Sequence, residues 1–277
     1  MRRITLSCLV FLLTPGCAGD DASDVPEEPA WTRQEIVGGM HAQPHEFPFM
    51  VSVQLQALTR SYHSCGGALL NAGWVLTGAQ CVEGVSSHEL RVVVGATRLQ
   101  GLGNGSDGKK VNVRKIVMHP GYDASSHAND IALLQLARPL DLAGGEGRLG
   151  VIPLPAQGSD PLPKENVVAI GWGATAEAGD LSKDLLKTPL PIVARAACRK
   201  LYGAALVTDS MICAAPAEGG KGPCQGDEGG PLVKRDDSGA TTLVGVRSWS
   251  TGCGRKGFPS VFTRVGSFMD WIQQNMH

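Results

Sequence analysis

The sequence predicts an all-β fold with a single helix at its C-terminus, and three observations support this. Glycine contributes 36 and proline 17 of the 277 residues, as many tight turns between short strands would require. Short runs rich in β-branched residues recur between these turns. A helical spacing of apolar residues is found only in Ser267–Met276, where Phe268, Trp271 and Ile272 share one face. This pattern alone leaves a sandwich and a barrel as alternatives.

Seven segments are predicted as strands because each is short, apolar or β-branched, and bounded by turn residues. They are Phe49–Gln54, Arg91–Val94, Val111–Met118, Ile131–Leu136, Val167–Trp172, Thr242–Ser248 and Val261–Val265. Apolar residues make up 43% of the chain, which is enough to form a core. The formal net charge is only -1 and no basic stripe is present, so we expect no nucleic-acid partner.

The N-terminal residues 1–17 are predicted to form a secretory signal. A basic start, Met1–Arg3, precedes the apolar run Ile4–Leu13, which is too short to span a bilayer. Two kinds of processing remain open. Cleavage before Cys17 would resemble a bacterial lipoprotein with a lipid anchor on that cysteine. Cleavage after Ala18 would release the protein, so the predicted location is either the bacterial cell envelope or the extracellular space.

Residues 18–35 are predicted to be a flexible tether, or propeptide. The segment is acidic and contains two prolines, so it cannot bury enough apolar surface to fold. From residue 36 to residue 277 the sequence has the character of one globular domain.

Six cysteines follow the signal segment, namely Cys65, Cys81, Cys198, Cys213, Cys224 and Cys253. An even number of cysteines in an exported chain favours disulfides over metal ligands. Since no Cys-x-x-Cys spacing occurs, a zinc site is not expected either. We therefore predict neither a metal nor a cofactor.

Four segments carry a family resemblance. These are Ile36-Val37-Gly38-Gly39, Leu76-Thr77-Gly78-Ala79-Gln80-Cys81, Asn129-Asp130-Ile131-Ala132-Leu133-Leu134 and Cys224-Gln225-Gly226-Asp227-Glu228-Gly229-Gly230-Pro231-Leu232. In this order they resemble the mature N-terminus, the histidine segment, the aspartate segment and the nucleophile loop of the trypsin/chymotrypsin family. The resemblance extends over roughly residues 36–274. It implies two packed six-stranded antiparallel β-barrels with a cleft between them, and the disulfides Cys65–Cys81, Cys198–Cys213 and Cys224–Cys253.

Two of the three catalytic positions implied by the resemblance hold unsuitable residues. Asp130 matches the aspartate, but Gln80 stands at the histidine position and Glu228 at the serine position. An amide side chain does not titrate near neutral pH, so it cannot relay the proton. A carboxylate nucleophile would form an anhydride, and the leaving amine would still lack an acid. We therefore expect the triad to be non-functional.

The same residues suggest a self-contained arrangement. The Gln80 amide is expected to donate to Asp130 and to meet Glu228. The Glu228 carboxylate is expected to enter the oxyanion hole, which the resemblance assigns to the backbone N–H groups of Gly226 and residue 228.

The resemblance also implies an activation switch. Cleavage before Ile36 would free an amino group that pairs with Asp227. The preceding residue is Glu35, so a trypsin-like activator would not cut there, although a glutamate-specific one could. In the uncut state, Ser52 and His63 match the residues that hold this aspartate. We expect the zymogen-like set of Ser52, His63 and Asp227 slightly in preference to the inserted one.

The specificity pocket implied by the resemblance has Gly222 at its base and Ser250 and Ser260 on its walls. With no charge at the base, a small or medium neutral side chain is expected to fit. Ser248-Trp249-Ser250 resembles the edge segment that pairs with an extended peptide. The partner expected from this segment is a protein or an extended peptide, and the chain is expected to be a monomer.

The function predicted from these residues is that of an inactive serine-protease homologue acting as a binding module. One alternative is a serine-type endopeptidase that retains weak activity. Another is a hydrolase that acts on a different substrate, with Asp130 and Glu228 as paired carboxylates.

Overall fold

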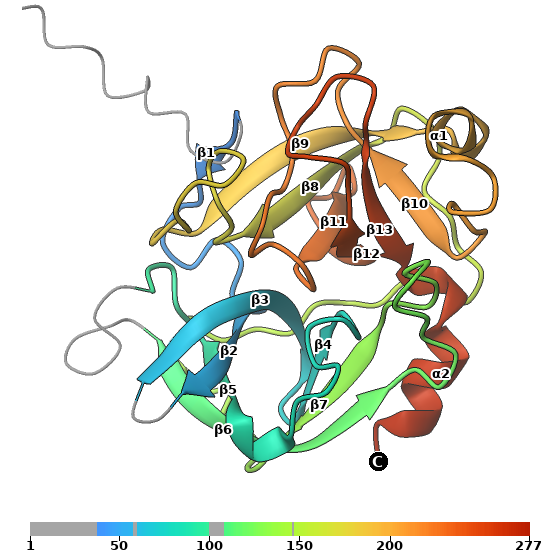
Figure 1. Ribbon diagram of the computed structural model, residues 1–277. Coiled ribbons are helices and arrows are strands. Elements are labelled where there is room, and N and C mark those ends of the chain that lie inside the picture. The colour runs from blue at the N-terminus through green and yellow to red at the C-terminus, as the bar shows by residue number, and fades with distance from the viewer. Residues whose placement is uncertain (1–37, 58–59, 100–107, 146) are drawn as a thin grey trace, which may run out of the picture. The chain divides into compact units, whose positions relative to one another are not determined.

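The computed structural model describes residues 38–57, 60–99, 108–145 and 147–277 (Figure 1). The predicted signal, the tether, Cys17, Glu35 and Ile36 lie outside the described residues. Thirteen strands and two α-helices are found within them.

The first barrel contains six antiparallel strands in the closed order β2-β3-β4-β7-β6-β5. Their bounds are β2 (Met50–Ala57), β3 (Arg60–Asn71), β4 (Trp74–Thr77), β5 (Leu90–Val94), β6 (Lys109–Met118) and β7 (Ala132–Leu136). A short 3-10 helix, η1 (Ser87–Glu89), precedes β5. Fully buried side chains such as Val51, Leu69, Leu76 and Leu134 fill the interior. Ring closure leaves this sheet without an exposed edge.

The second barrel is built from the other half of the chain (Figure 1). Its strands are β8 (Asn166–Gly171), β9 (Leu186–Val193), β10 (Met211–Ala214), β11 (Pro231–Arg235), β12 (Thr241–Trp249) and β13 (Ser260–Arg264). They follow the order β9-β10-β13-β12-β11-β8, and the pairing of β8 with β9 closes the ring. The two-residue strand β1 (Met40–His41) adds to β9. The predicted pair of six-stranded barrels is thus confirmed.

The C-terminal helix is confirmed as α2 (Met269–Asn275), which follows the 3-10 helix η2 (Val265–Ser267). The expectation that it would be the only helix was wrong, because α1 (Arg195–Tyr202) precedes β10. Helix α1 buries only Cys198. With only eight residues, it is too short for a helical spacing of apolar residues to be recognised in the sequence. The disulfide from Cys198 to Cys213 joins α1 to β10.

The structure contains all three disulfides that the resemblance implied, Cys65–Cys81, Cys198–Cys213 and Cys224–Cys253. Such bonds persist in oxidising compartments, so they fit an extracellular protein.

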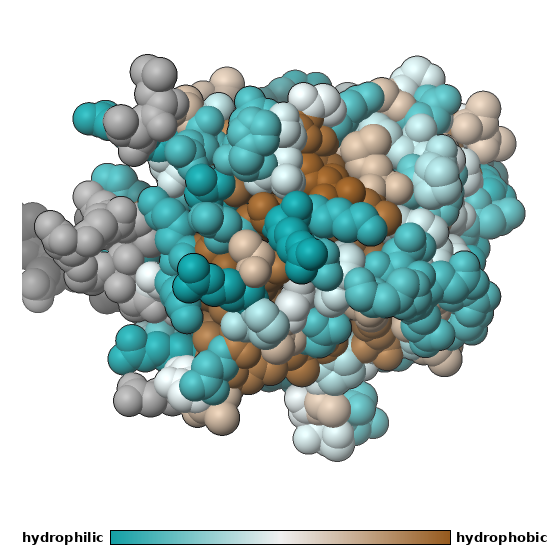
Figure 2. All heavy atoms as spheres, turned by 90° about the horizontal axis from the view of Figure 1, so that it is seen from below, coloured by the Kyte–Doolittle hydropathy of each residue, from teal (hydrophilic) through white to brown (hydrophobic). Residues whose placement is uncertain are grey.

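The face of the molecule that points downward in Figure 1 shows apolar areas interspersed with hydrophilic side chains (Figure 2). The large exposed apolar side chains are scattered along the chain, at Met40, Tyr62, Val151, Leu162, Leu181, Leu201, Leu206 and Phe258. Single exposed apolar residues of this kind do not mark a binding site. None of the helices in the described residues is long and apolar enough to cross a membrane.

Candidate active site

The three candidate catalytic positions are brought together from both barrels. Gln80 follows β4 and Asp130 precedes β7 in the first barrel, whereas Glu228 lies in the loop before β11 of the second. Hydrogen bonds fix the contact between the barrels. The Gly66 N–H on β3 donates to the Glu228 carbonyl at 2.7 Å, and the Thr263 hydroxyl on β13 donates to the Asp130 carbonyl at 2.7 Å.

The Asp130 carboxylate is fully buried and accepts three hydrogen bonds. The backbone N–H of Gln80 donates to its Oδ1 at 2.9 Å. The Gln80 side-chain amide and the Ser248 hydroxyl both donate to Oδ2, each at 2.6 Å. A buried carboxylate needs such donors to offset the loss of its hydration. The hydrogen bonds of the Asp130 carboxylate are therefore satisfied without any imidazole.

Gln80 makes a second hydrogen bond with the same amide nitrogen. Its Nε2 donates to the Ser248 carbonyl at 2.9 Å, so both amide hydrogens are used. The expected hydrogen bond from Gln80 to Glu228 is not made, because the Ser248 carbonyl takes the second donor. Gln80 thus acts as a bridge between the two barrels and offers no proton to a reacting group.

Glu228 turns its side chain back onto its own loop. The Gly226 N–H donates to Glu228 Oε2 at 2.7 Å. The carboxylate therefore occupies a donor that the resemblance assigns to the oxyanion hole, as the sequence led us to expect. A donor already bonded to a carboxylate cannot stabilise the oxyanion of a transition state.

Comparisons with known proteins identify the family of this chain. The family model described as trypsin matches residues 36–272. The chain is 40% identical to Trypsin-1 of Astacus astacus over 243 residues, which cover 87% of this chain and 99% of that protein. The chain belongs to the trypsin family.

Two further relatives of this trypsin-family chain differ in length. Trypsin Blo t 3 of Blomia tropicalis is 36% identical over 277 residues, covering 99% of this chain and 98% of its own length. Serine protease 56 of Mus musculus is 39% identical over 244 residues, which cover 87% of this chain but 38% of that protein.

Asp227, the trypsin-family aspartate next to the nucleophile position, lies buried among backbone donors. The Gly173 N–H donates to its Oδ1 at 2.8 Å, and the Cys224 N–H to its Oδ2 at 2.9 Å. Glycine makes room here, because a Cβ atom on Gly173 would lie 2.4 Å from the Asp227 carboxylate. Burial raises the pKa of Asp227 from its ordinary 3.8 to about 6, although the two N–H groups act in the opposite direction.

The zymogen-like set expected around Asp227 forms only in part. His63 Nδ1 lies 2.8 Å from the Ser52 hydroxyl, as predicted. However, His63 Nε2 lies 2.9 Å from the Gly226 carbonyl, and its bond to Asp227 is not made. The expectation of a Ser52–His63–Asp227 set was therefore wrong in its last link, since the Asp227 carboxylate faces Gly173 and Cys224 instead. Burial lowers the pKa of His63 from 6.5 to about 4, with the Gly226 carbonyl opposing the shift.

His63 and Asp227 influence stability in opposite directions as the pH changes. Between pH 4 and 6.5 the unfolded chain binds more protons at His63, so the free energy of unfolding falls as the pH drops through this window. Between pH 3.8 and 6 the folded chain binds more protons at Asp227, so the free energy of unfolding falls as the pH rises. The two windows overlap, and the contributions offset each other.

The positions of the specificity pocket are also brought together. A Cβ atom on Gly222 would lie 3.5 Å from the Ser260 hydroxyl oxygen. The Ser250 hydroxyl donates to the Gly252 carbonyl at 2.7 Å. Sequence reasoning missed Arg247, whose guanidinium donates to the Ser250 hydroxyl at 2.8 Å and is only 3% exposed. The expectation that only neutral residues surround the specificity pocket therefore does not hold. The signal that could have revealed Arg247 is its charge within the apolar run of β12.

Aromatic rings pack around Trp249, the residue that precedes Ser250. The Trp249 and Tyr202 rings meet edge to face with centroids 4.7 Å apart. The His127 ring stacks against Trp249 at 6.3 Å.

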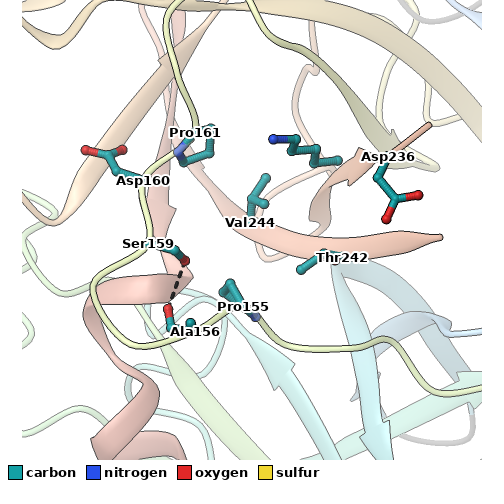
Figure 3. Close-up of a pocket in the computed structure, with 9 residues that line it drawn as sticks. Pro155, Ala156, Ser159, Asp160, Pro161, Asp236, Thr242 and Val244 are labelled. Carbon is teal, nitrogen blue, oxygen red and sulfur yellow. Dashed lines mark hydrogen bonds between the residues drawn. The ribbon is translucent and has the colours of Figure 1, made fainter. Parts of the chain in front are cut away.

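A pocket of about 290 Å³ lies away from the triad positions (Figure 3). It is lined by Pro155, Ala156, Ser159, Asp160, Pro161, Lys234, Asp236, Thr242 and Val244. Asp160 and Asp236 lie at opposite ends of it, and the Ser159 hydroxyl donates to the Ala156 carbonyl at 2.8 Å (Figure 3). Lys234 pairs with Glu165 at 2.7 Å. The side chains that line this pocket thus include no nucleophile paired with a base. In the described residues, no cluster of three or more metal-ligating side chains is found.

Proposed function

We propose that this trypsin-family chain is an exported protein that does not hydrolyse peptide bonds and instead binds a protein or an extended peptide. The observation that carries the proposal is the Gln80 amide, which bridges Asp130 and the Ser248 carbonyl where a proton-relaying imidazole is needed. An amide in this position holds the buried carboxylate but transfers no proton.

The loss expected from this replacement is large. Removing the catalytic triad of a serine protease costs about 10⁶ in turnover. Glu228 worsens the loss, because its carboxylate takes the Gly226 N–H. A peptide carbonyl that entered the cleft would have to displace that carboxylate before it met the donor. Neither of the two paired carboxylates, Asp130 and Glu228, lies free to act on another substrate in this arrangement.

Binding is supported by the intact scaffold around the altered residues. Trp249 and Tyr202 form an aromatic pair next to Ser250. Trp249 pairs with Val261 of β13 on one side, whereas the register between β11 and β12 ends at Val246. The end of β12 thus has no strand partner on the β11 side in the described residues, and an extended peptide could add there. The predicted signal and the three disulfides fit an exported protein, either anchored to the cell envelope through Cys17 or released.

The catalytic half of the proposal is tested with a serine-directed fluorophosphonate probe and a peptide hydrolysis assay. Both are applied to the full chain, uncut and cut before Ile36. We expect no labelling and no hydrolysis above background. The variant Q80H/E228S restores an imidazole and a hydroxyl, and the triple variant Q80H/E228S/D130N is its matched control. Hydrolysis by the wild type at trypsin-like rates, lost in Q80A or E228Q, would overturn the proposal.

The binding half is tested by selecting a displayed library of random peptides on the immobilised full chain. We expect enriched peptides whose binding is lost in Trp249→Ala. The control is Trp271→Ala, which removes an indole from α2, outside the cleft. Failure to enrich any sequence would count against peptide binding, as would enrichment that Trp249→Ala leaves unchanged.

A further inference from the structure

Arg247 is a buried cation whose guanidinium lies within the specificity-pocket region. It projects from β12 one residue before Ser248, and only 3% of it is exposed. Its Nη2 donates to the Ser250 hydroxyl at 2.8 Å, and its Nη1 reaches the Val261 carbonyl at 3.5 Å. Both partners are neutral. The side chain therefore spans the space between the wall residue Ser250 and strand β13.

The hydrogen-bonding capacity of this guanidinium is mostly unused. An arginine side chain carries five N–H donors. The Nε–H of Arg247 is buried without a partner, and within the described residues the side chain forms no ion pair. Buried charges are ordinarily paired, because an unpaired one loses its hydration without compensation. The guanidinium of Arg247 thus lacks a directly bonded, negatively charged partner.

The two nearby carboxylates do not fill this role. Glu228 directs its carboxylate to the Gly226 N–H, and Asp227 directs its own to the Gly173 and Cys224 N–H groups. Their negative charge favours the protonated form of Arg247 from a distance, whereas burial lowers its pKa. Neither gives the guanidinium the direct hydrogen bonds that a contacting carboxylate would supply.

We propose that Arg247 makes the specificity pocket of this chain a site for a carboxylate, so that the bound peptide places an acidic side chain or its C-terminal carboxylate there. The inference rests on the proposed peptide-binding function. Ser250 is only half-buried, so the carboxylate approaches past its hydroxyl and takes over its hydrogen bond from Arg247. A basic side chain is excluded, because it would bring a second cation to a guanidinium that has no counter-ion. A large aromatic side chain is excluded because Arg247 already occupies the space.

The test uses the full-length chain and five-residue alanine peptides with a central glutamate, glutamine or lysine, all blocked at both ends. We expect the glutamate peptide to bind at least about 10-fold more tightly than the other two, as pairing with a buried charge requires. The preference should disappear in Arg247→Met and persist in Arg114→Met, which removes an exposed arginine on β6. An alanine peptide with a free C-terminal carboxylate, compared with its amide, distinguishes the two carboxylate sources.

A second measurement reads Arg247 directly in the wild-type protein. In a ¹⁵N–¹H spectrum of arginine Nε–H groups, the glutamate peptide and N-acetylglutamate should each shift the Arg247 signal. Equal binding of all three blocked peptides, or preference for lysine, overturns the inference and leaves peptide binding intact. If no peptide binds, either in this assay or in the displayed library, the proposed function fails. N-acetylglutamate then decides the inference alone, because a shifted signal upholds the carboxylate site and an unshifted one removes it.

Discussion

Replacing Gln80 with alanine tests whether the amide is the structural bridge between the barrels. The side-chain nitrogen donates to the buried Asp130 carboxylate at 2.6 Å and to the Ser248 carbonyl at 2.9 Å. A hydrogen bond to a charged group is worth about 1.5–3 kcal/mol, and one between neutral groups about 1 kcal/mol. Asp130 keeps the backbone N–H of residue 80 and the Ser248 hydroxyl. We therefore expect Gln80→Ala to lower the free energy of unfolding by about 3 kcal/mol.

The assay is urea unfolding at pH 7, followed by tryptophan fluorescence in the full chain under non-reducing conditions. Gln80→His should cost less than Gln80→Ala, because an imidazole N–H can still donate to Asp130. Gln80→Glu should cost more, because a second carboxylate would face the buried one. The control Gln273→Ala, at an exposed position of α2, should change the free energy by less than about 0.5 kcal/mol. If Gln80→Ala also lowers the free energy of unfolding by less than about 0.5 kcal/mol, the amide is not a structural bridge between the barrels.

Two further predictions concern pH and covalent structure. The wild type loses stability between pH 7 and pH 4, because the pKa of His63 is lowered to about 4 by burial and only the unfolded chain binds a proton there in this window. His63→Gln removes this loss. The free energy of unfolding of the variant, relative to that of the wild type, should therefore rise by about 3 kcal/mol from pH 7 to pH 4. A difference that stays constant in chemical denaturation across this range would contradict the shift. Replacing Cys198 and Cys213 by serine opens the bond between α1 and β10 and should cost about 3 kcal/mol. Calorimetry should then show an unfolding temperature lower by about 6–12 °C, and an unchanged temperature would mean that α1 is held by other contacts.

The barrel strands could be predicted where the chain supplies its own signal. Runs such as Val51–Val53 and Val92–Val94 are β-branched and bounded by turns, and each falls within a strand. Strand β9 gave no such signal because Pro189 and Pro191 interrupt it. Both prolines lie in register with β8, so pairing with a neighbour, rather than local preference, makes this segment a strand.

The candidate site could be located from its motifs but not fully described from them. The sequence shows which residue stands at each triad position, and hence that Gln80 cannot relay a proton. It does not show which way a side chain turns. Asp227 faces Gly173 and Cys224 because backbone N–H groups from two separate loops meet there, and His63 is left with the Gly226 carbonyl. Arg247 was missed because motif reasoning stops at the residues that a motif names.

The charges of the cleft explain why Gln80, Glu228 and Arg247 are best considered together. Glu228 brings a carboxylate into a region that already contains Asp130 and Asp227, both almost fully buried. The Gln80 amide and the Gly226 N–H each give one carboxylate a neutral donor, which satisfies its hydrogen bonding without cancelling its charge. Arg247 contributes positive charge to the same region. Burial lowers the pKa of its guanidinium, and the charges of Glu228 and Asp227 oppose this shift. An active serine protease must keep its oxyanion hole and its specificity pocket open for substrate. In this chain the Glu228 carboxylate takes the Gly226 N–H, and the Arg247 guanidinium bonds to Ser250. A ligand gains affinity here only where it improves on these internal contacts, and the unsatisfied Nε–H of Arg247 is such a place.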